Sequence, residues 1–481
     1  MPDNHRPNIL LIFPDQHRWD ALGCAGSPVV RSPNIDRLAA EGVLFNRAYT
    51  NAPLCIPARA SFITGRFPHQ HGTLRNQRRF PPPSGPNLVR NLAAAGYHCA
   101  LIGKVHLGYP TRDTRENVEQ LKTYGFTHVD EEFGKQAYSV CTSPWTDMLA
   151  AKGVLDDYKR DMRARAAKVA TELMGVPPED LAGLEPREAW YAGPTAVACE
   201  DFIDHSIGDR LVNWLESYSG EQPFFLWAGF CGPHDPFDAP QEYADPYLAA
   251  PDTIPLGSVK RFTLTPSELY NKTLEWVARY SDSDHLTPER IRRLRAFYYA
   301  NVTLIDERIG HMLAVLENKG LLDNTWIVYT SDHGDILGDH LLINKTLMYE
   351  GSVHIPVIVR PPKGTEPRRL DPLVDLNDVG ATLLEMVGAA PVEGSLARSL
   401  LPLIGGTDQK LHKAVFSEVT AFSTVITDRY KYVIERESGV PCALYDLVED
   451  PAEDNNLAGD PASEEVRRRL FEEHLKPFLA G

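Results

Sequence analysis

Short uninterrupted runs of apolar residues recur along the chain, and polar residues follow each of them. These runs span residues 8–13, 98–102, 224–230 and 325–329. Continuous apolar runs of this length are typical of strands buried on both faces, and the first one suits a central strand of a parallel sheet. In open α/β sheets, ligands gather just past the carboxyl ends of such strands. The polar residues after each run are therefore candidates for a functional site.

Helical periodicity fills much of the sequence between these runs. The clearest case begins at Thr287-Pro288, where threonine can cap a helix and proline suits its first turn, and it ends before Gly320. Apolar residues at helical spacing or a closing glycine predict further helices. The predicted helices span 34–42, 88–95, 156–174, 201–218, 286–319 and 373–387.

The C-terminal part has a different pattern. Gly405-Gly406 and the polar stretch after it suggest a boundary, which divides the chain into residues 1–405 and 406–481. Beyond it, three short alternating runs predict strands of an antiparallel sheet, with a turn near Asp428-Arg429. The runs lie at 414–419, 424–427 and 431–435, and a helix is predicted over 464–479.

Composition narrows the function classes. The chain has 481 residues, 43% hydrophobic and 24% charged, as in ordinary globular proteins. Its net charge of -16 argues against a nucleic-acid partner or an anionic membrane surface. An acidic protein can still contain a local cationic pocket, so an anionic small-molecule substrate stays open.

Cysteine usage and the N-terminus bear on the compartment. The seven cysteines are scattered and include no Cys-x-x-Cys pair, which indicates a reducing environment. Too few residues precede the first predicted strand for a signal-peptide core or a membrane span. We therefore expect a cytoplasmic protein, and a homo-oligomer is left open.

The segment Asn51–Gly72 contains the most informative motif, Cys55-x-Pro57-x-Arg59. A cysteine is more often a small buried hydrophobe than a reactive group. Here, however, proline fixes the backbone directly before a predicted helix and constrains the residue before it. Cys55 then lies at a helix N-terminus, which favours anions, and Arg59 adds a planar cation suited to sulfate or phosphate oxygens.

Other polar residues follow the predicted strands. Taken singly, each is better explained as a turn or loop residue. Adjacent Asp and His do offer a hard oxygen and an imidazole nitrogen to a divalent ion. Lys104 and His106, two apart on an extended segment, are expected to point to the same side. The full set is Asp15, Gln16, Lys104, His106, His234, Asp332 and His333.

Together these motifs resemble type I sulfatases of the alkaline phosphatase superfamily. The Cys55 segment through Thr64-Gly65-Arg66 resembles the family signature, and Gly103-Lys104-Val105-His106-Leu107-Gly108 resembles its second signature. The string Ser331-Asp332-His333-Gly334-Asp335 is similar to the second metal cluster of the family. The resemblance runs from Asn8 to about Asn456. His354 stands where the family often has arginine, so it receives no role.

The resemblance implies a fold and cofactors. The expected fold is α/β: a large mixed, mostly parallel sheet flanked by helices, with a smaller C-terminal α+β subdomain on a short antiparallel sheet. A formylglycine-generating enzyme would oxidise Cys55 to formylglycine. A divalent metal, calcium before magnesium or manganese, would be bound by Asp15, Gln16, Cys55, Asp332 and His333.

The same resemblance implies roles in the hydrolysis of a small-molecule sulfate monoester. A hydroxyl of the formylglycine hydrate would attack sulfur. Arg59, Lys104 and Lys345 would surround the sulfate with positive charge. His234, together with Lys345, would protonate the leaving oxygen, and His106 would take a proton from the second hydroxyl so that sulfate is released.

Two other functions fit many of these residues. A phosphonate monoester hydrolase or phosphodiesterase of the same superfamily shares the Cys-x-Pro-x-Arg, Asp-Gln and Asp-His features. Lys104 and His106 favour sulfate over phosphonate. The second alternative, a non-catalytic anion- or sugar-binding relative, is disfavoured by the complete set of site residues. The alcohol half of the substrate cannot be read from the sequence.

Overall fold

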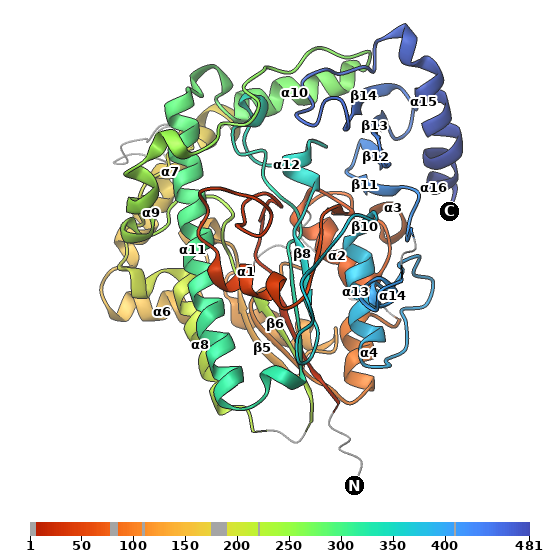
Figure 1. Cartoon of the computed structure of the whole chain (residues 1–481). Coiled ribbons are helices and arrows are strands. Elements are labelled where there is room, and N and C mark those ends of the chain that lie inside the picture. Colours follow the sequence, from red (N-terminus) through yellow and green to blue (C-terminus); the bar gives the residue numbers. More distant parts are fainter. Residues whose placement is uncertain (1–5, 77–84, 108–110, 175–189, 220–221, 408–409) are drawn as a thin grey trace.

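An eight-stranded sheet forms the centre of the computed structural model, which describes residues 6–76, 85–107, 111–174, 190–219, 222–407 and 410–481 (Figure 1). Every neighbouring pair of strands is parallel except the two pairs that include β8. The strand order is β5 (His128–Glu132), β4 (His98–Lys104), β6 (Phe224–Gly229), β1 (Asn8–Ile12), β7 (Thr325–Thr330), β8 (Val357–Arg360), β2 (Val43–Phe45) and β9 (Arg368–Leu370).

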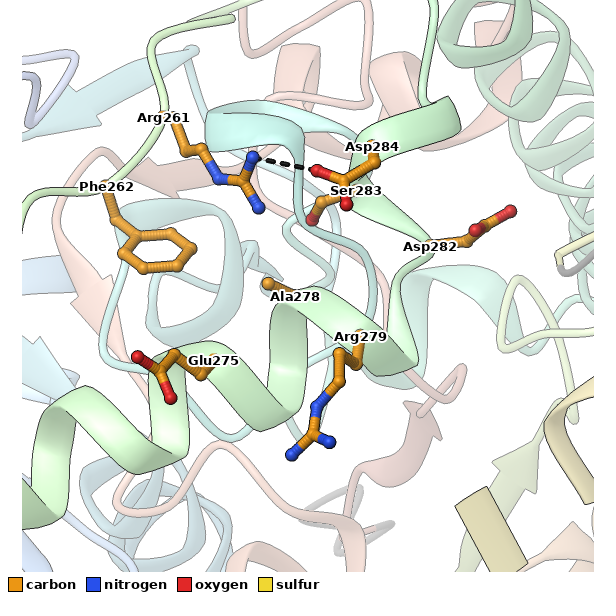
Figure 2. Close-up of a pocket in the computed structure, with 8 residues that line it drawn as sticks. All are labelled: Arg261, Phe262, Glu275, Ala278, Arg279, Asp282, Ser283 and Asp284. Carbon is orange, nitrogen blue, oxygen red and sulfur yellow. Dashed lines mark hydrogen bonds and ion pairs between the residues drawn. The ribbon is translucent and has the colours of Figure 1, made fainter. Parts of the chain in front are cut away.

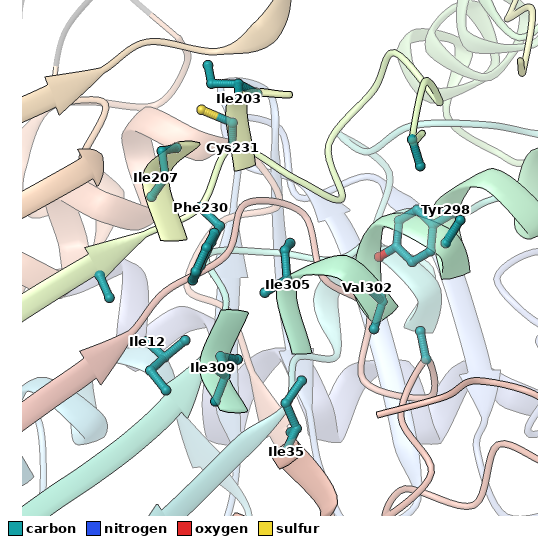
Figure 3. Close-up of a cluster of buried hydrophobic side chains, with 14 of the residues drawn as sticks. Ile12, Ile35, Ile203, Ile207, Phe230, Cys231, Tyr298, Val302, Ile305 and Ile309 are labelled. Atoms are coloured by element: carbon teal, nitrogen blue, oxygen red, sulfur yellow. The ribbon is translucent and has the colours of Figure 1, made fainter. Parts of the chain in front are cut away.

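Alternate residues of the central strand β1 enter two different hydrophobic cores. Leu10 and Ile12 belong to one core, and Ile9 and Leu11 to the other. Both faces are covered, which explains why the strand is continuously apolar rather than alternating. In the first core, Ile12 lies with residues of α1 (Pro33–Ala40), α8 (Ile203–Ser217) and α11 (Pro288–Asn318) (Figure 3). In the second core lie residues of α2 (Cys55–Thr64), α4 (Leu88–Ala94) and α13 (Leu376–Glu385).

Smaller elements complete the main body. Strand β3 (Ala48–Tyr49) pairs in parallel with β10 (Val374–Asp375). A 3₁₀ turn, η2, spans Lys135–Ser139. The remaining helices here are α3 (Pro68–His71), α5 (Val118–Lys122), α6 (Pro144–Ala151), α7 (Leu155–Met174), α9 (Gln241–Leu248), α10 (Glu268–Tyr280), α12 (Glu350–Val353) and α14 (Leu401–Ile404).

The C-terminal region forms a separate antiparallel sheet of four strands. These are β11 (Val415–Glu418), β12 (Phe422–Ile426), β13 (Tyr430–Glu435) and β14 (Pro441–Asp446). The sheet packs against α10, where Tyr270 meets Phe422 edge to face at 5.0 Å between ring centroids. Helices α15 (Glu464–Leu470) and α16 (Lys476–Ala480) end the chain, joined by a π-helical turn, Phe471–Leu475.

The predicted fold class is confirmed, including the smaller antiparallel sheet. Three details differ from the sequence-based expectation. The helix expected from residue 373 begins at Leu376, because Val374–Asp375 pairs with β3. The helix expected over 464–479 contains the π-helical turn. Strand β14 was not predicted, and it completes the sheet. The division at residue 405 stays a prediction.

Within the described residues, helices that combine the length and the apolarity required to cross a membrane are absent.

Candidate active site

The predicted site residues converge at the carboxyl edge of the central sheet. Asp15 and Gln16 follow β1, Lys104 ends β4, and Asp332 and His333 follow β7. His234 follows β6, and an isolated bridge between Asp15 and Pro233 holds the two loops together. These four strands are neighbours and parallel, so their carboxyl ends meet at one edge.

Cys55 is the first residue of α2, as the Pro57 motif predicts. The preceding Leu54 is extended, and Gly65 ends the helix in a left-handed conformation with φ 63°. Every residue of α2 is buried. The Cys55 Sγ atom lies 3.1 Å from His333 Nε2 and 3.8 Å from Asp15 Oδ1. The thiol therefore faces the polar site rather than the apolar core.

Two fully buried carboxylates are held by two buried cations. Arg59 donates from Nη2 to Asp15 Oδ2 at 3.0 Å and from Nε to Asp332 Oδ2 at 2.8 Å. Lys104 Nζ lies 2.8 Å from Asp15 Oδ2. Arg59 also donates to the carbonyl oxygens of Lys104 and Val105. The guanidinium thus fixes three strand ends relative to one another.

Burial and charge set the protonation states at this centre. Burial raises the pKa of Asp15, but Lys104, His234 and Arg59 outweigh it and hold that pKa well below its usual range. Burial, reinforced by Asp15, raises the pKa of the Cys55 thiol to about 12. Near neutral pH the carboxylate is ionised and the encoded thiol is neutral, which makes it a poor nucleophile.

Four of these side chains fit a divalent cation. One possible ligand atom from each of Asp15, Cys55, Asp332 and His333 lies within 4.8 Å of the others, and all four residues are buried. The Nδ1 atom of His333 is 2.9 Å from the carbonyl oxygen of Gly334, so Nδ1 carries the hydrogen and Nε2 is the free ligand atom. Burial lowers the pKa of His333 to about 4, which keeps the ring neutral, as metal ligation requires.

Gln16 lies next to these four residues, and its backbone is in a left-handed conformation with φ 66°. Its backbone N–H donates to Asp332 Oδ1 at 3.0 Å, and its side-chain amide donates to Asp335. The Gln16 Oε1 atom accepts a hydrogen bond from Lys345 Nζ. Asp335 is the last residue of the Ser-Asp-His-Gly-Asp motif, and no role was predicted for it. It also accepts from the backbone of Asn344 at 2.9 Å and so positions both Gln16 and the Lys345 segment.

Lys345 and His234 form a hydrogen-bonded pair near Asp15, whose Oδ1 lies 3.9 Å from His234 Nε2. Lys345 Nζ is 2.7 Å from His234 Nε2, and His234 Nδ1 is 2.7 Å from the carbonyl oxygen of Asp235. Nδ1 is therefore the donor, and Nε2 accepts from the ammonium group. Burial and then Lys345 lower the pKa of His234 well below its usual range. In this arrangement the proton available for transfer is on Lys345.

The expected geometry of Lys104 and His106 is wrong in one respect. Strand β4 ends at Lys104, and His106 has φ 52°, so the pair does not share an extended segment. His106 nonetheless lies close enough for Lys104, Asp15 and Arg59 to influence its titration. Burial, followed by Lys104, lowers the pKa of His106 well below its usual range, and its Nδ1 has no hydrogen-bond partner among the described residues. Gly108 of the same motif lies outside the described residues.

Two features near the site have structural explanations. His354 is stacked between Trp19 and Tyr49, with ring centroids 4.3 and 4.8 Å apart, and its Nδ1 is 3.0 Å from Glu350. A second possible metal cluster comprises Asp375, Asp378 and His412. There, however, Asp375 caps α13, and Asp378 Oδ2 is 2.8 Å from His412 Nε2. Hydrogen bonds within the chain therefore account for these carboxylates.

A cavity of about 430 Å³ beside α10 is lined by other residues (Figure 2). Arg261 and Arg279 border it, and Arg261 forms an ion pair with Asp284 at 2.8 Å. Glu275 and Asp282 add opposite charge to its lining. None of the predicted site residues contributes to this cavity.

The fold and this centre define a hydrolase class that acts on esters of tetrahedral oxyanions. The particular family follows from the comparison with known proteins. The family model described as Sulfatase matches residues 7–389, and the model described as N-sulphoglucosamine sulphohydrolase, C-terminal, matches residues 338–477. This chain belongs to the sulfatase family, within the alkaline phosphatase superfamily, and is a sulfuric ester hydrolase.

Individual relatives span nearly the whole chain. An arylsulfatase of Clostridium perfringens is 28% identical over 98% of this chain and 94% of its own length. A choline-sulfatase of Rhizobium meliloti is 28% identical over 95% of this chain and 83% of its own length. The crystal structure of a phosphonate monoester hydrolase of Agrobacterium radiobacter superposes with a TM-score of 0.78 at 27% identity, covering 98% of this chain and 95% of that one.

Proposed function

We propose that this chain hydrolyses a small-molecule sulfate monoester with a formylglycine derived from Cys55. A divalent cation, calcium before magnesium or manganese, would be held by Asp15, Gln16, residue 55, Asp332 and His333. The observation that carries the proposal is the position of Cys55 Sγ, 3.1 Å from His333 and beside the Asp15 carboxylate. An aldehyde formed there would lie at a cation site rather than in the apolar core.

The cation and the formylglycine would supply a metal-polarised hydroxyl as the nucleophile. The protein's own cations supply the remaining charge. Arg59, fixed by Asp15 and Asp332, cannot move away when the substrate binds. Lys104 ends β4 and Lys345 lies in the connection between β7 and β8, and both are buried. Fixed cations in a water-poor site stabilise charge on the sulfuryl oxygens without reorganisation.

Proton transfer is assigned to the remaining groups. Lys345 carries the proton and His234 Nε2 contacts it at 2.7 Å, so the pair can deliver a proton to the leaving oxygen. His106 is held neutral by burial, and its Nδ1 atom has no hydrogen-bond partner in the part of the chain that the structure describes. A neutral imidazole has a free lone pair that can accept a proton, which suits the release step.

Two further parts of the proposal concern the protein's surroundings. Maturation would require a formylglycine-generating enzyme acting on the Cys55-x-Pro57-x-Arg59 motif. The cytoplasmic location expected from the sequence stays a prediction, and the oligomeric state stays open.

A phosphonate monoester hydrolase is the second candidate function. The likeness to the Agrobacterium radiobacter enzyme favours it, because that structure covers nearly the whole chain at a TM-score of 0.78. The cluster at the centre would serve either ester. Lys104 and His106 continue to favour sulfate.

Parallel assays of an aryl sulfate and a matched aryl phosphonate monoester test this ranking. Protein co-expressed with a formylglycine-generating enzyme should show a higher kcat/KM for the sulfate. Mass spectrometry of the peptide containing residue 55 should show the aldehyde in the same preparation. A higher kcat/KM for the phosphonate would reverse the ranking, and full activity with an unmodified thiol would refute the aldehyde mechanism.

A further inference from the structure

A buried polar network lies behind the segment 231–238, which carries His234. Asp204 of α8 is fully buried, and its Oδ1 accepts hydrogen bonds from the backbone N–H groups of Cys231 at 2.7 Å and Gly232 at 3.0 Å. A Cβ atom at Gly232 would lie 2.1 Å from Asn301 Oδ1 and 2.6 Å from Asp204 Oδ2. This contact explains why a glycine stands there. The first half of the segment is thus fixed by a carboxylate from a distant helix.

Lys135 of η2 holds the second half of the same segment. Its Nζ donates to the carbonyl oxygen of Pro236 at 2.7 Å and to Asp238 Oδ1 at 2.7 Å. The side chains of Lys135 and Asp238 are almost fully buried, with exposed fractions of 1% and 0%. Asn301 of α11 connects the two halves, because its Nδ2 donates to Asp204 at 3.1 Å and its Oδ1 is 3.5 Å from Lys135 Nζ.

The next residue in η2 contacts the segment as well. The Gln136 side chain donates to Asp235 Oδ2. Asp235 is the residue whose carbonyl oxygen accepts from His234 Nδ1, so its position sets the orientation of the imidazole ring. Lys135 and Gln136 therefore contact this part of the segment at two points, the Pro236 carbonyl oxygen and the Asp235 side chain.

Stability alone is a weak reason for this arrangement. A buried ion pair recovers little more than the desolvation cost of its charges, and well-packed apolar residues often do as well. The network instead applies several directional bonds from η2 and α8 to one short segment, and Asn301 of α11 links the two groups that make them. Directional bonds of this kind restrict where the segment, and hence the His234 ring, can lie.

We propose that Lys135 is a positioning residue that holds His234 where the His234–Lys345 pair can protonate the leaving oxygen. This inference rests on the proposed function of that pair. Proton delivery requires hydrogen-bond distance to the leaving oxygen, and a shift of the donor by 1 Å can cost about 10²-fold in rate. The effect depends on the leaving group, because a good leaving group departs without a proton.

The test compares Lys135→Met with the wild-type protein on aryl sulfates whose phenols range from strongly to weakly acidic. The variant should lose less than about threefold in kcat for the most acidic phenol and about tenfold or more for the least acidic. The plot of log kcat against phenol pKa should therefore become steeper. An equal loss for every substrate would overturn the proposal, as would no loss for any of them.

Lys431→Met is the matched control. Lys431 is also a fully buried lysine paired with carboxylates, but it lies in β13 and contacts Glu350 and Glu453. It should lower the stability without steepening the plot. The same steepening in this variant would show that lost stability, rather than the position of His234, causes the effect.

Gln136→Ala provides a second variant that keeps the buried ion pair. Gln136 is exposed, so we expect this variant to fold normally even if Lys135→Met does not. It should steepen the plot in the same direction but less, and an unchanged plot would count against the proposal. A wild-type protein that is matured but inactive on all these sulfates would instead refute the proposed function.

Discussion

Two buried charge clusters in this protein use similar residues in different ways. At the carboxyl edge of the main sheet, Arg59 and Lys104 hold Asp15 and Asp332. At the four-stranded sheet, Lys431 of β13 holds Glu350 and Glu453. The side chains of Arg59, Lys104 and Lys431 are at most 2% exposed in both clusters.

The clusters differ in what remains unpaired around them. At the second cluster, Glu453 Oε2 accepts from the Glu350 backbone N–H at 2.7 Å, and Glu350 Oε2 contacts His354 at 3.0 Å. Ion pairs with the lysine and these hydrogen bonds together account for both carboxylates of the second cluster. In the first cluster, by contrast, Asp15 lies beside a neutral thiol, and the nearby His106 Nδ1 has no hydrogen-bond partner among the residues that the structure describes. Buried charge alone therefore does not identify a functional site in this protein; the reactive groups next to the charge do.

Replacing the Cys55 thiol should abolish the activity expected at the first cluster and leave the second cluster unchanged. We expect Cys55→Ala to lower kcat/KM for an aryl sulfate by about 10³-fold or more, because the nucleophile is lost. The free energy of unfolding, measured with urea, should change by about 1 kcal/mol or less.

Cys442→Ala is the control for this variant, since Cys442 is an equally buried thiol in β14. It should keep its activity after maturation. Comparable activity in the two variants would contradict the role of residue 55.

Removing Lys431 should have the opposite effect. Lys431→Met leaves Glu350 and Glu453 without their cation, and breaking a buried pair in this way costs about 3–5 kcal/mol. The folded fraction should retain its activity within about twofold of the wild type. Thermal unfolding and kcat per folded molecule check both parts. A large loss of kcat with unchanged stability would show that this cluster is more than structural.

Removing divalent ions should also distinguish the two clusters, because only the first one is expected to bind an ion. A cation that binds only the folded state, at 100 times its Kd, adds about 2.7 kcal/mol of stability. Chelation should therefore lower both Tm and activity, and added calcium should restore them. Asp332→Asn, which weakens one ligand of the first cluster, should reduce the Tm response, whereas Lys431→Met should keep it. An equal response in both variants would place the ion elsewhere.

Glu131 differs from both clusters, because its buried carboxylate has no ion pair within the described part of the chain. Burial raises the pKa of Glu131 in β5 to about 8, although Asn117 donates to it at 3.0 Å. The folded state therefore keeps a proton that the unfolded chain releases from about pH 4.5 upward, and stability falls between about pH 4.5 and 8.

Glu131→Gln should remove part of this pH dependence. Above pH 8, where the buried Glu131 is ionised in the folded state as well, the variant should be more stable than the wild type by about 2 kcal/mol or more. Urea titrations at pH 5, 7 and 9 check this. Parallel stability curves for the two proteins would show that Glu131 does not titrate in this window.

Several elements could be predicted from the sequence because their signals are local. The continuous apolar runs identified β1, β4, β6 and β7, and Thr287-Pro288 identified the start of α11. The family resemblance then selected the polar residues at the strand ends. Strand β14 was missed because its sequence, Pro441–Asp446, pairs with β13 only in the tertiary structure.

The conformation of His106 and the roles of Asp335, Lys135 and Asp204 were beyond sequence reasoning. Asp335 at least belongs to the Ser-Asp-His-Gly-Asp motif, whereas no sequence motif points to Lys135 or Asp204. Their partners lie far away in the sequence: Lys135 contacts Pro236 and Asp238, and Asp204 contacts Cys231. A single side chain that bonds a distant backbone segment leaves no periodicity or spacing to recognise.

The sequence by itself thus determined the sheet-forming runs and the Cys55 motif, because these are local patterns, and its family resemblance indicated the residue types needed for sulfate chemistry. Only the tertiary structure decided which charges share a carboxylate, where protons reside and which groups hold His234. Those properties depend on distances and burial between segments that are remote in the chain, and Coulomb energies and desolvation change steeply with both.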